Sequence, residues 1–386
     1  YKAKTKPERG FSANMKAIRD VVAQGFDIPP TTKTGAVKTD GETLEKAAAN
    51  LAPGNPDHIL LQYRAFKKIE KTQGYLKTLQ PGTVHRLHSR PNVLVATGRT
   101  SWSGPNLQQL PRAAGLRECI VPPRGYALLL CDFDSLELRT LAQVLLDLTG
   151  SSQLARHYQR DPDFDPHTNL ASQILGISYE DGLRRKALKD KQLLDTRQLS
   201  KAANFGYPGG MGVEKFILFA FQSYGVTLSY DQAHKLRQDW FAAYPEMRQY
   251  FNLINSYKGG SIKQLRSNRV RGNVGFCDAA NSFFQGLAAD GAKHGLRLIT
   301  RECYTDPSSP LYGSRPVVFV HDENILYTPL DRVADAGPRL AELMRIGMEK
   351  YVPDVPIRCE EAAAMEWNKR AEPTYDEEGK LTLWGA

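Results

Sequence analysis

Apolar residues recur at helical spacing in two segments near the N-terminus of the chain. Ser12 is expected to cap the first helix. The apolar face of this helix carries Met15, Ile18, Val21 and Val22. A second helix is expected from Asp57, and its apolar face carries Ile59, Leu60, Tyr63, Phe66 and Ile69. Residues 27–57 are rich in proline, glycine and threonine, which predicts a long irregular connection between the two helices.

The middle of the chain changes from a strand pattern to a helical one. Residues 126–133 form a continuous apolar run that includes one acid near its end, which is typical of a buried central strand. A helical pattern follows and is expected to stop at Gly150. Residues 156–274 are more polar, and we expect them to be mostly helical.

Two acids accompany apolar runs that lie far apart in the sequence. Asp132 ends the first run, and Asp322 lies between the runs 317–320 and 325–327, a pattern that predicts a β-hairpin with acids at its bend. Phosphoryl transfer by two divalent ions about 3.5–4 Å apart requires carboxylates that the fold brings together. An aspartate at the end of a strand is more often a turn or cap residue, so either acid alone leaves both interpretations open.

The composition of the chain indicates which class of partner and which cellular compartment to expect. The 386 residues suffice for two or three lobes, and the net charge of +9 favours nucleic acid, although many basic proteins bind none. The five cysteines form no CxxC pair, which argues against structural zinc and disulfides and for a reducing compartment. Because no apolar run could span a membrane and no export signal opens the chain, we expect a cytoplasmic setting, in a bacterial or virus-infected cell or in an organelle.

Five short motifs occur in the order in which they are found in DNA polymerase family A. They are LHSR at 87–90, TGRTSWSGPNLQQLP at 97–111, CDFDSLELR at 131–139, RQLSKAANFG at 197–206 and VHDE at 320–323. The last three resemble motifs A, B and C of the family, usually written DYSQIELR, RxxxKxxxFG and VHDE. Because the set is ordered along most of the chain, the sequence resembles the polymerase domain of family A, in a phage-like or viral variant.

The resemblance implies an α+β fold shaped like a right hand, with an antiparallel β-sheet in the palm and helical fingers and thumb. The expected divisions are a partial thumb at 1–75, fingers at 156–274, and a palm made of 76–155 and 275–386. The implied activity is the template-directed addition of deoxynucleotides to a primer 3′-hydroxyl, in replication or repair. Primer-template DNA and dNTP are the expected partners.

The resemblance also implies a metal site. Asp132 and Asp322 are expected to hold two Mg²⁺ ions, or Mn²⁺ in their place, with the carbonyl of Phe133 completing the ligands. Glu323 is expected to assist beside them. One ion would lower the pKa of the primer 3′-hydroxyl, and the other would hold the triphosphate.

Nucleotide contacts are implied for three residues of motif B and two outside it. Arg197, Lys201 and Phe205 share one helix face because they are spaced four residues apart. Without the motif, two solvated cations beside a core phenylalanine would be an equal interpretation. The resemblance places Lys201 at the α-phosphate side, Arg197 at the γ end and Phe205 against the base or sugar. It also implies that His167 contacts the phosphates and that Glu137 excludes a ribose 2′-hydroxyl.

Contacts with the primer-template are implied at positions spread over the expected palm. They are Arg90, Arg99, Asn281, Gln285 and His321. Several of these match positions that read the minor-groove side of the primer terminus. Every correct base pair presents acceptors at equivalent places there, so the shape of the pair is checked rather than its sequence.

Motif B departs from the family pattern directly after Phe205. Pro208 lacks a backbone N–H, so we expect the helix to end or kink about one turn early. The tyrosine that the family uses near the templating base is replaced by Gly209. Tyr207 is the candidate substitute, although two residues correspond to about 200° around a helix. Asp134 and Ser135 of motif A depart as well, so fidelity is the property that the resemblance predicts least.

The resemblance covers only part of a family member. The chain begins without Met, at a point that resembles the inside of the thumb, and the acids of a 3′–5′ exonuclease are not visible. We therefore expect no exonuclease activity in this chain. We expect the preceding part to have been removed, or to be supplied by another chain that carries the exonuclease or the N-terminal polymerase segment.

Three other classes of protein remain as alternatives. A single-subunit RNA polymerase shares the palm and its two acids, but Glu137 and the sequence VHDE favour DNA synthesis. An inactive DNA-binding relative would have lost a metal ligand or a cation of motif B, and all of these are present. A reverse transcriptase would carry a YxDD signature, which the sequence does not contain.

Overall fold

The computed structural model describes residues 14–32, 34–79, 86–111 and 115–385. The chain divides into two compact units, residues 1–85 and 86–386, and each is described by itself. Ser12, the predicted cap, lies outside the described residues. The expected thumb boundary after residue 75 falls within a helix of the first unit, and the division into thumb, palm and fingers stays a prediction.

The first unit is a small helical cluster made of α1 (Met15–Gln24), α2 (Gly41–Leu51) and α3 (Ile59–Thr78). The side chain of Asn14 caps α1 by accepting hydrogen bonds from two first-turn N–H groups. The apolar core of this unit consists of Ile18, Val22, Leu44, Ala47, Ala48, Leu60 and Tyr63. The apolar faces that were predicted for the segments now seen as α1 and α3 therefore supply most of the core.

The irregular connection predicted for residues 27–57 is wrong, because α2 lies within it. The side chain of Asp40 accepts a hydrogen bond of 3.0 Å from the N–H of Thr43, and this cap starts the helix. Leu44 and the following alanines then give α2 a buried face. The helical pattern of α2 is short, and turn-forming residues are abundant on both sides of it. For this reason the sequence pattern did not predict the helix.

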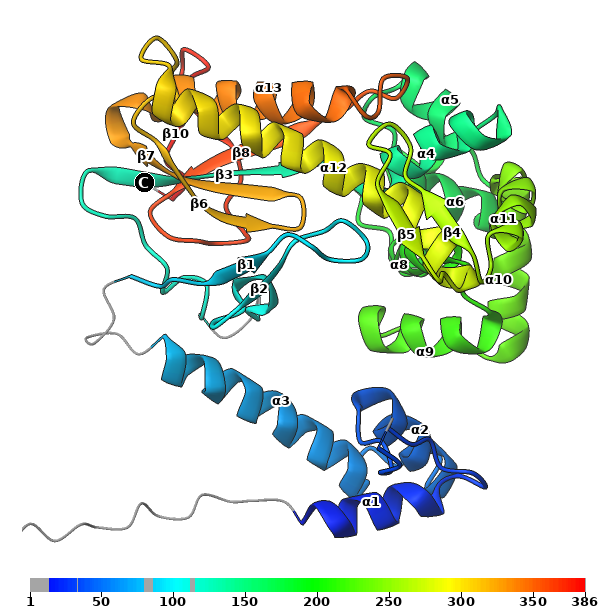
Figure 1. Ribbon diagram of the computed structural model, residues 1–386. Coiled ribbons are helices and arrows are strands. Elements are labelled where there is room, and N and C mark those ends of the chain that lie inside the picture. Colours follow the sequence, from blue (N-terminus) through cyan, green and yellow to red (C-terminus); the bar gives the residue numbers. More distant parts are fainter. Residues whose placement is uncertain (1–13, 33, 80–85, 112–114, 386) are drawn as a thin grey trace, which may run out of the picture. The chain divides into compact units, whose positions relative to one another are not determined.

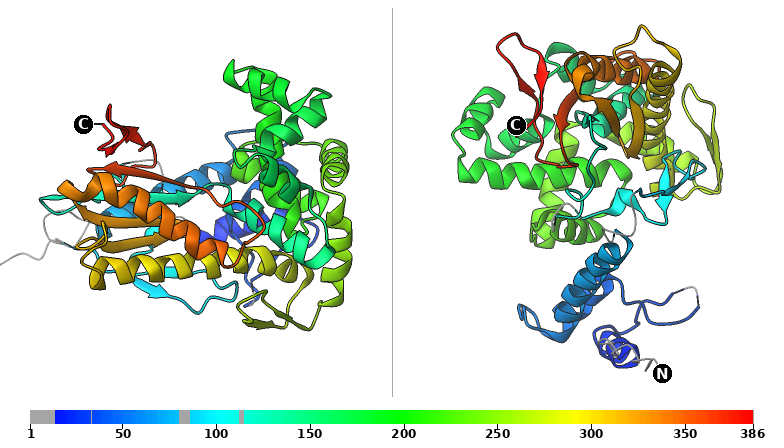
Figure 2. Two further views of the ribbon diagram at one scale, coloured as in Figure 1. Left: turned by 90° about the horizontal axis from the view of Figure 1, so that it is seen from above. Right: turned by 90° about the vertical axis from the view of Figure 1, so that its left-hand side faces the viewer.

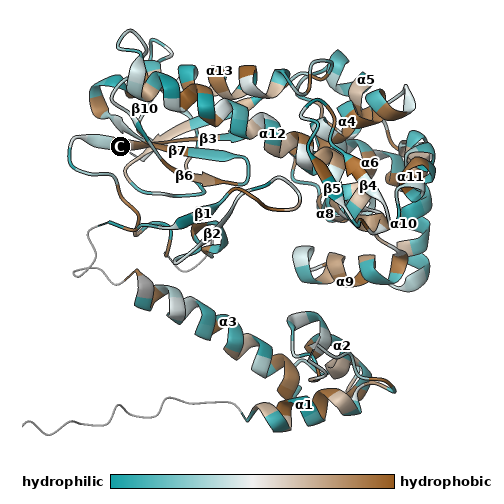
Figure 3. Ribbon diagram, in the orientation of Figure 1, coloured by the Kyte–Doolittle hydropathy of each residue, from teal (hydrophilic) through white to brown (hydrophobic). Residues whose placement is uncertain are grey.

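The apolar face predicted for α3 is confirmed only in part, near the start of the helix. Leu60 and Tyr63 are buried, whereas Ile59 and Ile69 are 52% and 70% exposed. Hydrophobic and hydrophilic residues both appear along α3 (Figure 3). The core of the first unit thus uses a narrower stripe of α3 than the sequence pattern indicates.

The second unit is organised around an antiparallel sheet with the strand order β6-β7-β3-β8. The strands are β3 (Tyr126–Phe133), β6 (Arg315–Val320), β7 (Glu323–Pro329) and β8 (Cys359–Ala364). The predicted buried strand and the predicted hairpin are both confirmed, since β3 lies between β7 and β8 and a two-residue turn joins β6 to β7. The helices α12 (Phe276–Thr305) and α13 (Val333–Glu349) pack against each other and against the sheet (Figure 1).

The alternation of side chains along β3 determines where Asp132 lies. Leu129, Cys131 and Phe133 belong to the main apolar core together with residues of α12 and α13. Successive side chains of a strand point to opposite faces of the sheet. Asp132 therefore lies on the face away from that core, at the end of a strand that is otherwise buried.

Helices make up most of the chain between β3 and α12. The helix α4 (Leu136–Thr149) ends as predicted at Gly150, which has a left-handed φ of 75°. The helical prediction for residues 156–274 is confirmed, apart from the hairpin β4–β5. These elements are α5 (Gln153–Arg160), α6 (Pro166–Leu175), α7 (Tyr179–Ala187), α8 (Lys191–Gly206), α9 (Val213–Tyr224), α10 (Tyr230–Ala243), α11 (Glu246–Ser256), β4 (Ser261–Lys263) and β5 (Val270–Gly272).

Short elements complete the second unit. They are β1 (Arg90–Asn92), β2 (Ser101–Ser103), β9 (Thr374–Tyr375), β10 (Leu381–Thr382) and the 3₁₀ turns η1 (Leu107–Gln109), η2 (Tyr207–Gly209) and η3 (Leu330–Arg332). The hairpin β9–β10, which the sequence patterns did not predict, is a two-stranded sheet of its own and is the red hairpin near the C-terminus in Figure 2. A single parallel bridge joins Leu383, which follows β10, to Ala363 of β8. The backbone N–H of Trp384 donates to the carbonyl of Ala363 over 2.7 Å, and Leu381 is buried against α13. None of the described helices is both long enough and apolar enough to cross a bilayer.

Candidate active site

The sheet brings the predicted catalytic acids together. The antiparallel ladder pairs Cys131 of β3 with Asn324 of β7, so the next residues, Asp132 and Glu323, follow at the same end of the two strands. Asp322 lies in the two-residue turn that precedes Glu323. The other turn residue, His321, has a left-handed φ of 58°, a conformation that is uncommon for residues other than glycine. Such strain is characteristic of functional turns.

The electrostatics of this acid cluster favour a cation. Burial raises the pKa of Asp322 to about 7, and the negative charge of Asp132 adds to the effect. Burial also raises the pKa of Glu323, although the ammonium group of Lys369 opposes the shift. The Oδ1 atom of Asp132 is buried without a hydrogen-bond partner. A buried, unpartnered carboxylate oxygen is costly unless a cation balances it.

These residues fit the expected Mg²⁺ ions. Within the described ranges, no group of three histidine, cysteine, aspartate or glutamate side chains is gathered as a ready-made metal site. Mg²⁺ does not require one, because it is usually bound by one or two carboxylates together with substrate phosphates and water. Asp132 and Asp322 are the two carboxylates that would hold such ions. The ring of Phe133 is buried in the core, so its carbonyl is the group that could act as a ligand.

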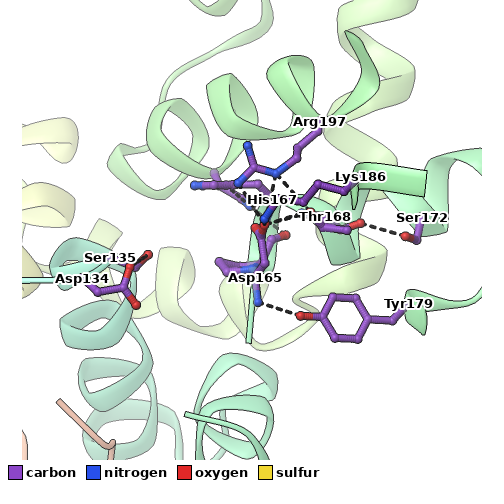
Figure 4. A network of polar contacts seen from close by, with 11 residues as sticks. Asp134, Ser135, Asp165, His167, Thr168, Ser172, Tyr179, Lys186 and Arg197 are labelled. Atoms are coloured by element: carbon purple, nitrogen blue, oxygen red, sulfur yellow. Dashed lines mark hydrogen bonds and ion pairs between the residues drawn. The ribbon is translucent and has the colours of Figure 1, made fainter. Parts of the chain in front are cut away.

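A second set of polar residues surrounds Asp165, the residue that caps α6 (Figure 4). The Oδ2 atom of Asp165 accepts from the guanidinium of Arg197 at 2.9 Å and from the ammonium of Lys186 at 2.8 Å. Arg197 also donates to the hydroxyl of Thr168 over 3.0 Å. Burial raises the pKa of Asp165, but Lys186 and Arg197 outweigh it and hold that pKa well below its usual range. The first cation of motif B is therefore held in a fixed position.

His167 is a neutral, buried residue whose tautomer is fixed by its neighbours. The indole N–H of Trp240 donates to Oδ1 of Asn204 over 3.1 Å, so the amide nitrogen of Asn204 faces the other way. That nitrogen lies 3.1 Å from Nδ1 of His167, which must then accept. Burial lowers the pKa of His167 to about 4, and the charges of Arg197 and Lys201 act in the same direction. The single ring proton consequently resides on Nε2.

The rest of motif B lies beside His167. The rings of His167 and Phe205 have centroids 5.4 Å apart and are tilted by 50°. Lys201 lies one turn before Phe205 on α8 and close enough to His167 to lower its pKa. The helix α8 thus carries Arg197, Lys201 and Phe205 on the side that faces α6 and His167, as their spacing predicts.

The helix of motif B ends early, as predicted. It stops at Gly206, and Tyr207–Gly209 form one 3₁₀ turn. The proposed substitution by Tyr207, however, finds no support in this arrangement, because Tyr207 is fully buried. Its hydroxyl donates to the carbonyl of Ala233 over 2.9 Å, and its ring stacks on Phe216 with centroids 4.2 Å apart. We therefore assign Tyr207 to the packing of the helical region rather than to nucleotide contact.

Arg99, a predicted primer-template contact, and Glu137, a predicted nucleotide contact, form an ion pair near Asp322. The guanidinium of Arg99 is paired with the carboxylate of Glu137 at the start of α4. Both charges act on Asp322, Glu137 raising its pKa and Arg99 lowering it, behind the larger effects of burial and of Asp132. Glu137, the predicted sugar-excluding residue, is thus held beside the acid cluster.

The other predicted primer-template residues lie on β1 and α12. Arg90 begins β1 and is exposed. Asn281 and Gln285 share one face of α12, and the amide of Gln285 donates to Oδ1 of Asn281 over 3.4 Å. The amide of Asn281 donates to the carbonyl of Gly209 over 3.4 Å, which connects α12 to the turn after motif B.

Sequence reasoning missed four residues of this region. Asn204 lies inside motif B, and Asp165 and Trp240 lie outside the five motifs, but all three acquire their roles through tertiary contacts. Lys369 was also missed, although its ammonium lies 3.1 Å from both Asp132 and Glu323. The segment around Lys369 resembles none of the motifs, so no local signal indicated it.

The antiparallel sheet with acids at one end, joined to a helical region that carries the cations of motif B, is the architecture of a right-hand polymerase domain. A solved structure described as the POL domain of Pol1 from M. smegmatis in complex with DNA primer-template and dNTP has the same fold, with a TM-score of 0.68 and 22% identity. The match covers 93% of this chain and 62% of that one. The right-hand α+β fold predicted from the sequence is confirmed.

The sequence comparisons show the family. Residues 11–369 match the model of DNA polymerase family A, and the chain belongs to that family. Over 366 residues it is 32% identical to the thermostable DNA polymerase I of Thermus thermophilus. The match covers 88% of this chain and 39% of that protein. It is 25% identical to DNA polymerase I of Aquifex aeolicus, covering 92% of this chain and 58% of the relative. The chain thus spans about two fifths of the length of the Thermus relative.

Proposed function

We propose that this chain is a template-directed DNA polymerase domain that adds dNTPs to a primer 3′-hydroxyl and contains no 3′–5′ exonuclease. The observation that carries the proposal is the meeting of Asp132 with Asp322 and Glu323 at one end of the sheet. Membership in DNA polymerase family A supports it as well. The curated relatives are described as DNA polymerase I.

Asp132, Asp322 and the carbonyl of Phe133 would hold two Mg²⁺ ions, for which Mn²⁺ is the expected substitute. When bound, such ions supply Lewis acidity at the 3′-hydroxyl and neutralise the charge of the triphosphate. The largely buried carboxylates of Asp322 and Glu323 contribute negative charge where the dielectric is low, which strengthens the hold of the site on a cation. Glu323 would assist by adding negative charge next to Asp322.

The nucleotide would be held by the cluster around α8. Arg197, fixed by Asp165, provides a charged donor for the γ end of the triphosphate, and Lys201 provides one nearer the α-phosphate. His167 donates from Nε2 to a phosphate oxygen without carrying a charge of its own. Phe205 packs against the base or sugar. Glu137 lies beside Asp322, where it would exclude a ribose 2′-hydroxyl.

The primer-template would be held by Arg90, Arg99, Asn281, Gln285 and His321. The net charge of +9 suits a polyanionic partner. The proposal retains the thumb, palm and fingers division given above. It includes a separate exonuclease or N-terminal polymerase segment as a partner, and a cytoplasmic setting, which the five free cysteines support.

Primer extension tests this function. Wild-type chain is incubated with a labelled primer on a defined template, Mg²⁺ and dNTPs, next to Asp322→Asn. The exposed Asp331→Asn, which makes the same chemical change on η3, is the matched control. We expect extension by wild type and Asp331→Asn, and a loss of at least about a hundredfold in Asp322→Asn. Extension that survives in Asp322→Asn, or that uses rNTP as well as dNTP, would contradict the proposal.

A further inference from the structure

A lysine side chain lies among the proposed metal ligands. The ammonium nitrogen of Lys369 is 3.1 Å from Oδ2 of Asp132 and 3.1 Å from Oε2 of Glu323. It therefore bridges one acid of β3 and one of β7. Lys369 is also the last residue of the family match, so it lies at the limit of the recognised domain.

The backbone that carries Lys369 is firmly held. The N–H of Trp367 donates to the carbonyl of Ile120 over 2.9 Å. The fully buried indole of Trp367 packs under the guanidinium of Arg117, with 4.6 Å from its carbon to the ring centroid. Asn368, also buried, accepts from the N–H of Arg370 over 3.0 Å. The position of Lys369 beside the acids is thus built into the fold.

The side chain of Lys369, in contrast to its backbone, is able to leave the acids. It is 28% exposed, and a lysine ammonium is a point charge on a flexible four-carbon chain. It uses Oδ2 of Asp132 and leaves the buried Oδ1 without a hydrogen-bond partner. One ammonium therefore balances only part of the negative charge in the cluster of Asp132, Asp322 and Glu323.

We propose that Lys369 is an internal counter-ion that competes with divalent metal for Asp132 and Glu323 and thereby sets the metal concentration that this chain requires. The inference rests on the proposed function, because it assumes that Asp132 is a metal ligand. In the absence of metal, Lys369 stabilises the acid cluster. When a divalent ion binds, the ammonium moves away toward solvent.

Lys369 and a divalent ion compete for the same carboxylates. Each must therefore weaken the binding of the other by the same factor. Replacing Lys369 by a neutral residue of similar size should strengthen metal binding by roughly fivefold to a hundredfold, the usual range of such couplings. The same change should lower the melting temperature of the metal-free protein, because the acids lose their counter-ion. Metal should then restore more stability to the variant than it adds to wild type.

The test is a titration with Mn²⁺ alone, in which electron paramagnetic resonance measures the free ion. The full chain is compared with Lys369→Met and with Lys369→Arg, which keeps the charge. Lys380→Met is the matched control, since it removes one exposed charge whose ion-pair partner is Glu378. Asp132→Asn identifies the portion of bound Mn²⁺ that belongs to this site. Lys369→Gln provides the same comparison if the Met variant does not fold.

The expected result is a Mn²⁺ dissociation constant at least about fivefold lower in Lys369→Met than in wild type. Lys369→Arg and Lys380→Met should stay near the wild-type value. Mn²⁺ that binds wild type and Lys369→Met equally, and is lost in Asp132→Asn, would overturn the role of Lys369 while leaving the metal site intact. An absence of Mn²⁺ binding at Asp132 in every variant would overturn both this inference and the proposed metal site.

Discussion

The amide nitrogen of Asn204 lies 3.1 Å from Nδ1 of His167, and this contact determines which ring nitrogen of His167 carries the proton. Trp240 fixes the orientation of the amide from the other side, since its indole N–H can only donate. A neutral histidine with its proton on Nε2 remains a hydrogen-bond donor over the whole physiological pH range. The proposed phosphate contact therefore depends on a residue that need not touch the nucleotide.

Asn204→Asp should convert His167 from a neutral residue into a cation. The new carboxylate still accepts from Trp240, but its second oxygen faces Nδ1, which must then be protonated. We expect the pKa of His167 to rise from about 4 toward its ordinary value or above, as measured by NMR of the ring nitrogens. The KM for dNTP should become dependent on pH between about 5 and 8. An unchanged pKa of His167 would contradict the role assigned to Asn204.

Asp322 should make the metal-free protein less stable as the pH rises. Its folded pKa of about 7 lies above the unfolded value near 3.9, so between these values the folded state binds more protons. The contribution of Asp322 to the free energy of unfolding is therefore fully present at low pH. It is lost as the pH rises from about 4 to about 7 and does not change further above that. In EDTA at pH 8, Asp322→Asn should be more stable than wild type by about 1–3 kcal/mol in urea unfolding.

The comparison of the two proteins at pH 4.5 serves as the control, because other groups titrate equally in both. The difference in unfolding free energy between wild type and Asp322→Asn should be much smaller there. A difference of equal size at both pH values would mean that Asp322 is not perturbed as described. Added Mn²⁺ should stabilise wild type at pH 8 more than it stabilises the variant.

Gly209 should be required for the position of Asn281. A Cβ atom at residue 209 would lie 2.6 Å from the amide nitrogen of Asn281 and 2.7 Å from its oxygen. Because the end of a side chain can move, Gly209→Ala should fold but displace Asn281, and primer-template affinity should fall by roughly threefold to tenfold. Fluorescence anisotropy with labelled DNA measures this effect.

A double-mutant cycle separates displacement of Asn281 from other effects of Gly209→Ala. In an Asn281→Ala background, the clash is removed, so Gly209→Ala should cost little additional DNA affinity. Fully additive losses would show that residue 209 acts without Asn281. Far-UV circular dichroism of each variant checks that the helices are retained.

Arg99 should support sugar discrimination through its ion pair with Glu137. Glu137→Ala removes the group expected to exclude the 2′-hydroxyl, so rNTP incorporation should rise relative to dNTP by about tenfold or more. Arg99→Leu should give a smaller rise, because Glu137 remains but loses its partner. Single-nucleotide incorporation with matched dNTP and rNTP measures both ratios. An effect of Arg99→Leu on rNTP incorporation that persists in Glu137→Ala would exclude the ion pair as its cause.

Local sequence patterns were enough to predict some of the elements correctly. The apolar run of β3, the hairpin around Asp322 and the end of α8 before Pro208 all follow from such patterns. The short helix α2 was missed because its signal is brief and lies among turn-forming residues. Tyr207 was the candidate substitute for the family's tyrosine, but in the 3₁₀ turn after α8 it is buried in the core. Contacts between distant segments, such as Lys369 with Asp132, have no local signal at all.

The most direct test of template-directed DNA synthesis by this chain is whether the templating base selects the nucleotide that is added. Four primer-templates that differ only in the templating base are each given one dNTP at a time, with Mg²⁺ and excess protein. We predict that each template directs incorporation of its complementary dNTP and that Asp132→Asn abolishes all four reactions. Incorporation that is the same for every templating base, or none with any dNTP despite bound DNA and metal, would contradict the assignment of this chain as a template-directed DNA polymerase.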